Sequence, residues 1–149
     1  MGDEQKEELL NAWLQMSLCV RGNRLLKNLS LNEVAVCNYL YRNRDSGKEI
    51  TATHICEEFR IFKSQMNKVI SSLEEKGVIE RYQGLDDKRK LCIRLKEDKL
   101  SIYLDEHEHV LQIMDAVEKS LGKENTAQLA NLMKMATAAV NELQGETKL

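Results

Sequence analysis

The chain of 149 residues contains no proline, only 5% aromatic residues and no hydrophobic run near the roughly 20 residues that a membrane span needs. The missing proline and the few aromatics favour a mostly helical architecture over a β-sandwich. The four cysteines are widely scattered and form no Cys-x-x-Cys pair, as is typical of reduced thiols in a cytoplasmic protein. Residues 1–8 are polar and acidic, so we expect no secretory signal there. We therefore predict a cytoplasmic protein without a membrane span.

The residue patterns of common enzymes and metal sites are also missing. There is no glycine-rich phosphate loop, no HExxH motif and no ordered Ser/His/Asp set, and the chain has only three histidines. Asp105 and His109 share one helical face, as a chelating pair must, but spacing assigns them no further Cys or His ligand. A solvated acidic helix face is the simpler explanation of these residues. We predict no enzymatic activity, no cofactor and no metal ion.

The formal net charge of −2 conceals a basic segment on an acidic chain. Residues 60–96 carry ten Lys and Arg against five Asp and Glu, whereas the remaining residues carry twelve basic and nineteen acidic side chains. An ordinary solvated face would mix the two signs. Segregation of this kind indicates a DNA-binding segment on a scaffold that does not bind DNA.

Hydrophobic residues recur at three- and four-residue steps over most of the chain, which predicts helices. Ser, Thr and Asn stand where N-terminal caps belong, and glycine stands where helices end. The expected helices are 3–20, broken or bent at Gly22-Asn23; 31–41, capped by Ser30 or Asn32; 52–59, capped by Thr51; 97–121, ended by Gly122; and 124–143, capped by Asn125 or Thr126.

Another amphipathic helix follows the turn at residues 60–62 and ends at Lys76-Gly77. Its apolar stripe consists of Phe62, Met66, Val69, Ile70 and Leu73. Its outer face is short-chained, hydrogen-bonding and cationic, which is the chemistry needed to contact base edges and phosphates. This outer face consists of Lys63, Ser64, Gln65, Asn67, Lys68 and Ser71.

A β-hairpin is predicted after this helix, with strands at 78–83 and 91–95. The connection at 84–90 begins with glycine, is polar and ends with three consecutive cations. A helix followed by a two-stranded ribbon with a basic tip is typical of a winged helix-turn-helix. The helix suits the major groove, and the tip can reach the adjacent minor groove or the backbone. The predicted fold class is therefore mostly α with a small β-hairpin.

The string LEEKGVIER at 73–81, followed by DKRKLCIRL at 87–95, resembles the MarR family of bacterial transcription regulators. In that family a helix ending in a charged-Gly-apolar-apolar-Glu-Arg string precedes a wing built on Asp-x-Arg. The sequence departs from the family at Phe62, where a small polar cap is common. The apolar helices at both chain ends suggest a dimerisation layer, and the resemblance implies the same. A single domain over 1–149 is expected, with the winged module at about 31–96 and dimerisation helices at about 3–20 and 97–144.

We expect a homodimer to bind a pseudo-palindromic operator in double-stranded DNA, and the resemblance implies a transcriptional regulator acting as a repressor. The expected contacts are Lys63, Lys68, Lys88 and Lys90 to phosphates, Gln65 and Asn67 to adenine, Lys68 to guanine, and Arg89, held by Asp87, to a narrow minor groove. Arg94 contacts the DNA backbone or shields the sheet. The alternative function is a winged-helix protein–protein module whose basic wing meets an acidic partner.

The resemblance also implies regulation, because MarR-like proteins commonly lose DNA affinity when a small aromatic ligand enters between the dimer layer and the winged module. Candidates for such a pocket, with ordinary core packing as the alternative, are Trp13, Met16, Tyr39, Tyr103 and His107. Some relatives sense peroxides through a cysteine in the first helix. Cys19 lies too close to the helix at 31–41 for that spacing and has no neighbouring resolving cysteine, so a buried or idle thiol is the simpler explanation.

Overall fold

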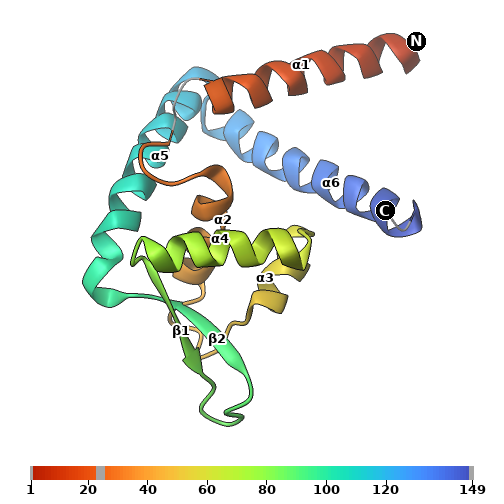
Figure 1. Cartoon of the computed structure of the whole chain (residues 1–149). Helices are drawn as coiled ribbons and strands as arrows, with labels where there is room; N and C mark the ends of the chain where they lie inside the picture. Colours follow the sequence, from red (N-terminus) through yellow and green to blue (C-terminus); the bar gives the residue numbers. More distant parts are fainter. Residues whose placement is uncertain (1, 23–25, 148–149) are drawn as a thin grey trace.

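The computed structural model describes residues 2–22 and 26–147, which form six α-helices, one 3-10 turn and a two-stranded sheet (Figure 1). The elements run in the order α1 (Gly2–Gly22), α2 (Leu31–Arg42), α3 (Ala52–Phe59), α4 (Lys63–Glu75), β1 (Ile79–Gln83), β2 (Leu91–Leu95), η1 (Glu97–Lys99), α5 (Leu100–Leu121) and α6 (Lys123–Thr147). This is the mostly helical architecture with a small hairpin that the sequence predicts. Helix α1 ends at Gly22, and Asn23 of the predicted break lies outside the described residues.

Reciprocal side-chain caps begin two helices of the winged module. At α2 the Ser30 hydroxyl accepts from the Glu33 N–H, and the Glu33 carboxylate accepts from the Ser30 N–H. At α3 the same exchange joins Thr51 and His54, with the His54 ring nitrogen as acceptor. Each exchange satisfies two backbone donors that a helix end would otherwise leave without a partner. The caps predicted at Ser30 and Thr51 are therefore confirmed.

The turn from α3 into α4 is short and depends on one left-handed residue. Arg60 has φ +54°, and the N–H of Ile61 then donates to the carbonyl of Cys56 over 3.2 Å. Ile61 packs against the core. Phe62, in contrast, is 73% exposed, so its assignment to the buried stripe of α4 was wrong. It occupies the N-cap position, one residue before the first turn of the helix, and its side chain makes no hydrogen bond to that turn.

The hairpin pairs β1 with β2 in antiparallel register from Ile79 opposite Leu95 to Gln83 opposite Leu91. The segment before α3 adds to this sheet, because the N–H of Ile93 donates to the carbonyl of Ile50 over 2.8 Å and Thr51 bridges to Cys92. The turn that precedes α3 is therefore fixed to the strand that leads out of the wing.

Two boundaries near the C-terminal end differ from the sequence prediction. The helix expected over 97–121 begins with the separate turn η1, and α5 follows it. Helix α6 begins at Lys123, so Asn125 and Thr126 are not its caps. Their side chains donate back to the carbonyls of Leu121 and Gly122, over 3.0 and 2.7 Å. Gly122, with φ +83°, makes the expected break between α5 and α6.

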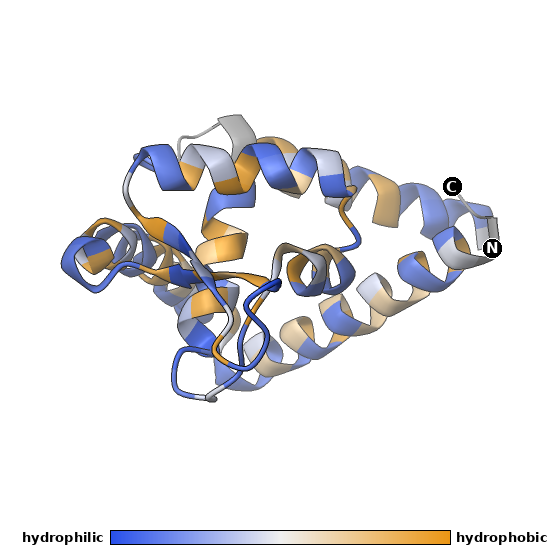
Figure 2. Ribbon diagram, turned by 60° about the horizontal axis from the view of Figure 1, so that its bottom comes forward, coloured by the Kyte–Doolittle hydropathy of each residue, from blue (hydrophilic) through white to orange (hydrophobic). Residues whose placement is uncertain are grey.

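The hydrophobic core belongs to the winged module and the first part of α5. Its buried residues are Leu29, Val36, Cys37, Leu40, Ile50, Ile55, Met66, Ile70, Leu73, Val78, Ile79, Ile93 and Tyr103. Helices α1 and α6 instead project as two arms from the end of α5 that lies away from the wing (Figure 1). Apolar residues recur along both arms without cover from the rest of the chain (Figure 2).

Candidate nucleic-acid interface

The outer face of α4 is open to solvent along the whole helix. All six side chains that the sequence assigns to DNA contact on this helix are exposed: Lys63, Ser64, Gln65, Asn67, Lys68 and Ser71. The opposite face places Met66, Ile70 and Leu73 in the core. Because apolar and polar residues alternate at the helical period, packing of the stripe turns the hydrogen-bonding and cationic side chains outward as one surface.

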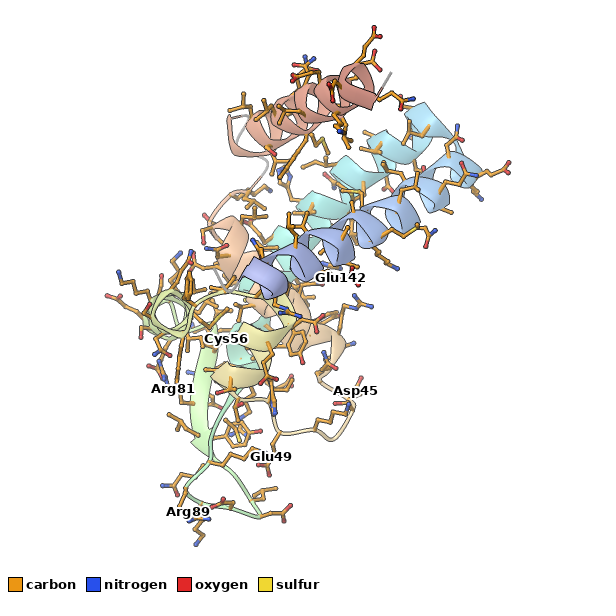
Figure 3. The ribbon with its side chains drawn as sticks, turned by 90° about the vertical axis from the view of Figure 1, so that its right-hand side faces the viewer. Asp45, Glu49, Cys56, Arg81, Arg89 and Glu142 are labelled. Carbon is orange, nitrogen blue, oxygen red and sulfur yellow. The ribbon has the colours of Figure 1, made fainter. Side chains whose placement is uncertain are left out.

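Arg81 on β1 extends this surface and was missed by the sequence analysis. Its guanidinium donates to the Ser71 hydroxyl over 3.3 Å and lies 3.5 Å from the Glu74 carboxylate. The side chain points from the strand toward α4 (Figure 3). The Glu-Arg pair at the end of the string 73–81 could have pointed to Arg81. Its hydrogen-bond partner, Ser71 on α4, lies ten residues earlier in the chain. Ser71 therefore already has a hydrogen-bond partner within the chain.

The loop between β1 and β2 forms a narrow wing with its cations at the outside. The N–H of Gly84 donates to the carbonyl of Lys90 over 2.9 Å, and the N–H of Lys90 donates to the carbonyl of Asp87 over 3.0 Å. These bonds close the loop, and Lys88, Arg89 and Lys90 are all exposed. Arg89 lies at the far end of the wing in Figure 3.

The predicted ion pair within the wing is present. The Asp87 carboxylate accepts from the backbone N–H of Arg89 at 3.0 Å and from its Nε at 3.1 Å, and Nη2 lies 3.4 Å from the second oxygen. The hydrogen bonds from Arg89 lower the pKa of Asp87. Asp87 thus stays ionised and holds one edge of the guanidinium through two hydrogen bonds, while the Arg89 side chain remains almost fully exposed.

Glu49 supports the base of the wing, a role that the sequence analysis did not identify. One carboxylate oxygen accepts from the N–H of Leu85 over 3.0 Å, and the other accepts from the Cys92 thiol over 3.4 Å. The Leu85 hydrogen bond is the main cause that lowers the pKa of Glu49. Gly84 lies directly against this group, since an added Cβ would stand 2.6 Å from the Glu49 carboxylate and 2.7 Å from the carbonyl of Asp87. Glycine is required at position 84, because Glu49 and the backbone of Asp87 leave no room for a Cβ atom.

Arg94 is partly exposed. Its contacts agree with the second of the two roles expected for it, in which it shields the sheet. Its Nε donates to the Glu80 carboxylate over 2.8 Å, and its guanidinium lies 4.3 Å from the centre of the Tyr82 ring. Both partners belong to β1, so Arg94 spans the outer side of the hairpin. A contact with the DNA backbone stays a prediction for this side chain.

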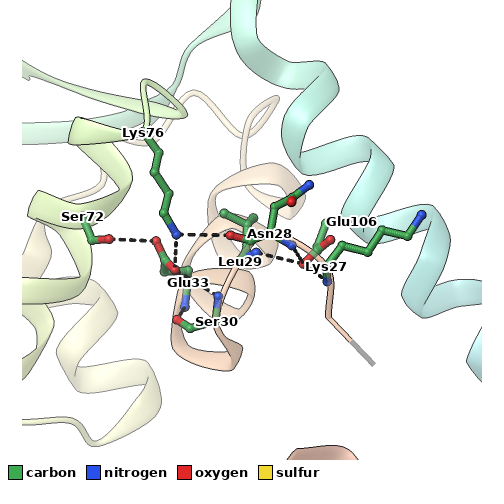
Figure 4. Close-up of polar contacts among 8 residues, drawn as sticks. All are labelled: Lys27, Asn28, Leu29, Ser30, Glu33, Ser72, Lys76 and Glu106. Carbon is green, nitrogen blue, oxygen red and sulfur yellow. Dashed lines mark hydrogen bonds and ion pairs between the residues drawn. The ribbon is translucent and has the colours of Figure 1, made fainter. Parts of the chain in front are cut away.

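A buried polar network sets the position of α4 relative to the other helices (Figure 4). The Glu33 carboxylate on α2 accepts from the Ser72 hydroxyl over 3.1 Å and from the Lys76 ammonium over 2.8 Å, both near the end of α4. Lys76 also donates to the carbonyl of Asn28 over 3.2 Å. Glu106 on α5 is 1% exposed, and one of its oxygens accepts the backbone N–H groups of residues 27, 28 and 29. The segment 27–30 therefore links the end of α4 to α5.

The charge on Glu33 is maintained despite its burial. Burial by itself would raise the pKa of this carboxyl, but the hydrogen bond and charge of Lys76 and the N–H of Ser30 outweigh it and lower the pKa. Lys76 is therefore paired with a buried carboxylate, although 40% of its own side chain is exposed. Further positive charge is exposed on the outer face of α4 and on the wing.

The five residues predicted to line a ligand pocket do not meet in one cavity of the described chain. Tyr103 is buried, its hydroxyl lies 3.2 Å from both Asn38 Oδ1 and His107 Nδ1, and burial raises its pKa to about 12. Tyr39 packs edge-on against Phe59. The other two, Trp13 and Met16, are exposed on α1. A pocket shared with a second chain stays a prediction.

The sequence offers two further candidate sites, a metal site at Asp105 and His109 and a redox site at Cys19. Asp105 and His109 border a polar hollow of about 340 Å³ on α5, and the described residues contain no cluster of three or more potential metal ligands. Cys19 is exposed on α1, whereas burial raises the pKa of Cys37 to about 12. None of the described helices is both long and apolar enough to cross a membrane.

A capped helix-turn-helix followed by a hairpin with an exposed cationic tip is a winged helix-turn-helix, a DNA-binding class. The sequence comparison identifies the family within this class. The family model described as transcriptional regulator SarA/Rot matches residues 24–105, more than half of the chain, and the chain belongs to this family. It is a winged-helix regulator of MarR type, as the resemblance predicted, and its family consists of transcriptional regulators rather than enzymes. No curated protein matches the chain significantly.

Solved structures agree with the fold. The PcaV transcriptional regulator from Streptomyces coelicolor, determined with its natural ligand, has 17% identity and a TM-score of 0.70 over 88% of this chain and 91% of that chain. The regulator BldR from Sulfolobus solfataricus has 17% identity and a TM-score of 0.69 over 93% and 99%. A probable transcriptional regulator from Pseudomonas aeruginosa has 16% identity and a TM-score of 0.71 over 91% and 99%. Similarity at this level of identity shows a shared fold.

Proposed function

We propose that this protein is a transcriptional repressor that binds a pseudo-palindromic operator as a homodimer and is released by a small aromatic ligand. The observation that carries the proposal is the exposed hydrogen-bonding and cationic surface formed by α4 and the wing of one module. Binding to the chromosome would place the protein in the cytoplasm.

The roles of the side chains follow from their chemistry. Lys63 and Lys68 on α4 and Lys88 and Lys90 on the wing are exposed and can neutralise phosphates. Within the major groove, amide side chains pair with adenine and a lysine can donate to guanine. Gln65, Asn67 and Lys68 have these roles in the proposed complex. Arg89 enters the minor groove, where a narrow A·T-rich segment concentrates negative potential.

The exposed apolar residues of the arms support a dimer. Large contiguous apolar surface is uncommon on monomeric proteins and marks an interaction site. The exposed large apolar residues of α1, α5 and α6 are Leu9, Leu10, Trp13, Leu14, Met16, Leu18, Leu111, Met114, Leu121, Leu129, Leu132, Met133, Met135, Val140 and Leu143. Two copies joined through these helices would present two recognition helices to half-sites about 34–36 Å apart.

A ligand can release the protein from DNA only if it binds two dimer geometries with different affinity. A ligand that binds both geometries equally does not shift the equilibrium between them. The PcaV structure contains a natural ligand of that protein, which is a precedent for ligand binding on this fold. In the proposed mechanism an aromatic ligand enters between the arms and the winged module. Its binding favours a spacing of the two α4 helices that does not fit the operator.

Selection of bound sequences from a random duplex pool, followed by footprinting, tests the proposal. We expect a two-fold symmetric footprint and a steep salt dependence. Eight lysine–phosphate contacts in the dimer give a slope of log K against log salt of about −7. Lys88→Ala should reduce that slope by about 2, since each dimer loses two contacts. Glu57→Ala, which changes an exposed charge on α3, is the control.

Two results would contradict the proposal. A chain that is monomeric at micromolar concentration removes the palindromic mechanism. Binding to an acidic protein with no duplex binding in low salt favours the protein–protein module instead. Transcription in vitro from a promoter that carries the selected site distinguishes a repressor from an activator.

A further inference from the structure

The winged module exposes few large apolar side chains, and the two most exposed lie on its DNA-facing elements. Outside α1, α5 and α6, the exposed large apolar residues are Leu31 at 52%, Phe62 at 73%, Leu85 at 86% and Leu91 at 50%. Phe62 immediately precedes α4, and Leu85 lies in the wing. Solvent exposure of most of a phenylalanine side chain is costly, because burial of such a group stabilises a fold.

Phe62 also occupies a position where another residue type would serve the helix better. It is the N-cap of α4, with φ −62° and ψ 142°, and it makes no side-chain hydrogen bond to the first turn. A serine at this position could accept from the N–H of Gln65, as Ser30 accepts from Glu33 at the start of α2. The fold therefore gains neither a cap nor burial from the phenylalanine. Its three following neighbours, Lys63, Ser64 and Gln65, are exposed beside it.

We propose that Phe62 is a specificity-determining residue that contacts the C5-methyl group of thymine in the major groove. Residues at the N-terminal end of a recognition helix are the ones that contact base edges. The thymine methyl is the apolar group that base pairs present in the major groove, and phenylalanine is among the side chains that contact it. This inference rests on the proposed function, because it requires α4 to enter the groove.

Replacement of thymine by deoxyuridine removes only the methyl group and retains the base pair. In a duplex chosen by selection, each thymine is replaced in turn, and the affinity of the full-length protein is measured at fixed salt. Loss of one methyl contact should weaken binding about fourfold, and loss of the symmetric pair about fifteenfold. Phe62→Ala should bind the thymine and uracil duplexes with equal affinity at that position.

Two further variants separate methyl contact from other effects. Leu85→Ala removes an apolar side chain that is even more exposed than Phe62. Leu85 lies in the wing, which in the proposed complex meets the minor groove, and that groove presents no methyl group. This variant should therefore retain the full thymine-to-uracil difference. Phe62→Ser should raise the melting temperature by supplying a cap while it abolishes the difference. A stabilised protein with less discrimination cannot be explained by damage to the fold.

The outcomes are distinguishable. A thymine-to-uracil loss that disappears in both Phe62 variants and persists in Leu85→Ala supports the inference. If the wild-type protein shows no loss at any thymine, or if Phe62→Ala shows the same loss, another group reads the base and the inference is wrong. If the wild-type protein binds no duplex, the proposed function fails first and this inference fails with it.

Discussion

Removal of the Glu33 carboxylate should destabilise the protein strongly, although Glu33 is not part of the candidate DNA-binding surface. Its side chain is 4% exposed and accepts hydrogen bonds from the Ser30 N–H at 3.0 Å, the Lys76 ammonium at 2.8 Å and the Ser72 hydroxyl at 3.1 Å. Glu33→Ala therefore breaks one half of the α2 cap and both contacts to α4 at once.

The magnitude follows from how well each former partner can find water. A hydrogen bond to a charged group contributes about 1.5–3 kcal/mol, and a neutral one about 1 kcal/mol. Lys76 keeps 40% of its side chain exposed and regains hydration, so the lower end of the range applies to it. Together with the cap, the expected loss is about 3 kcal/mol. For a chain of this length that corresponds to a fall in melting temperature of about 6–12 °C.

Urea unfolding followed by circular dichroism at one fixed protomer concentration measures this loss, because dimerisation would otherwise change the apparent stability. Glu75→Ala is the matched control, since Glu75 is an exposed carboxylate near the end of α4. Ser72→Ala removes one of the three contacts to this charged carboxylate and should cost about 1.5 kcal/mol. If Glu33→Ala unfolds within about 0.5 kcal/mol of the wild type, the network does not stabilise the position of α4 and the reasoning is refuted.

Three further predictions concern the same network and the wing. Stability that depends on ionised Glu33 is present above its unfolded pKa, near 4.5, and is lost as pH falls through its lowered folded pKa. Lys76→Met removes a cause of the lowered pKa while burial still raises it. The folded pKa then moves up toward or above the unfolded one, so the fall in urea midpoint from pH 7 to 3 should be smaller than in the wild type or reversed; a fall as large as that of the wild type would contradict this. Gly84→Ala should weaken duplex binding about fivefold or more in gel-shift titrations, because the added methyl meets Glu49 and the backbone of Asp87, while Gly145→Ala, at an open position, should not. Arg89→Lys retains the charge but loses the fork on Asp87, and should weaken binding about two- to fivefold; unchanged affinity of Arg89→Ala would exclude Arg89 from the interface.

Local chemistry was sufficient to predict the elements of the winged module. The cap at Thr51, the stop at Lys76-Gly77 and the strand at 91–95 each act through neighbours a few residues away, and the structure has all three. The burial along that strand does not alternate, because the adjacent residues Cys92 and Ile93 are both buried while Leu91 is exposed. The cationic loop was predictable for the same reason, since a run of lysine and arginine stays hydrated. The assignment of Phe62 failed because periodicity alone does not show where a helix begins.

The contacts that position these elements were decided by tertiary structure. Lys76 reaches Glu33 across 43 residues of chain, Glu49 reaches Leu85 across 36, and Glu106 reaches Leu29 across 77. Ser30 and Glu33 form a Ser-x-x-Glu capping pattern that is visible in the sequence. No local pattern, however, indicates that Glu33 also binds Lys76, or that Glu49 and Glu106 accept from donors far away in the chain. The sequence by itself thus determined which helices and strands form and which of their faces are polar. Only the packing of the chain decided which charged side chains remain exposed and which form ion pairs and hydrogen bonds that position α4 and the wing. The reason is that burial and pairing depend on residues far apart in the chain.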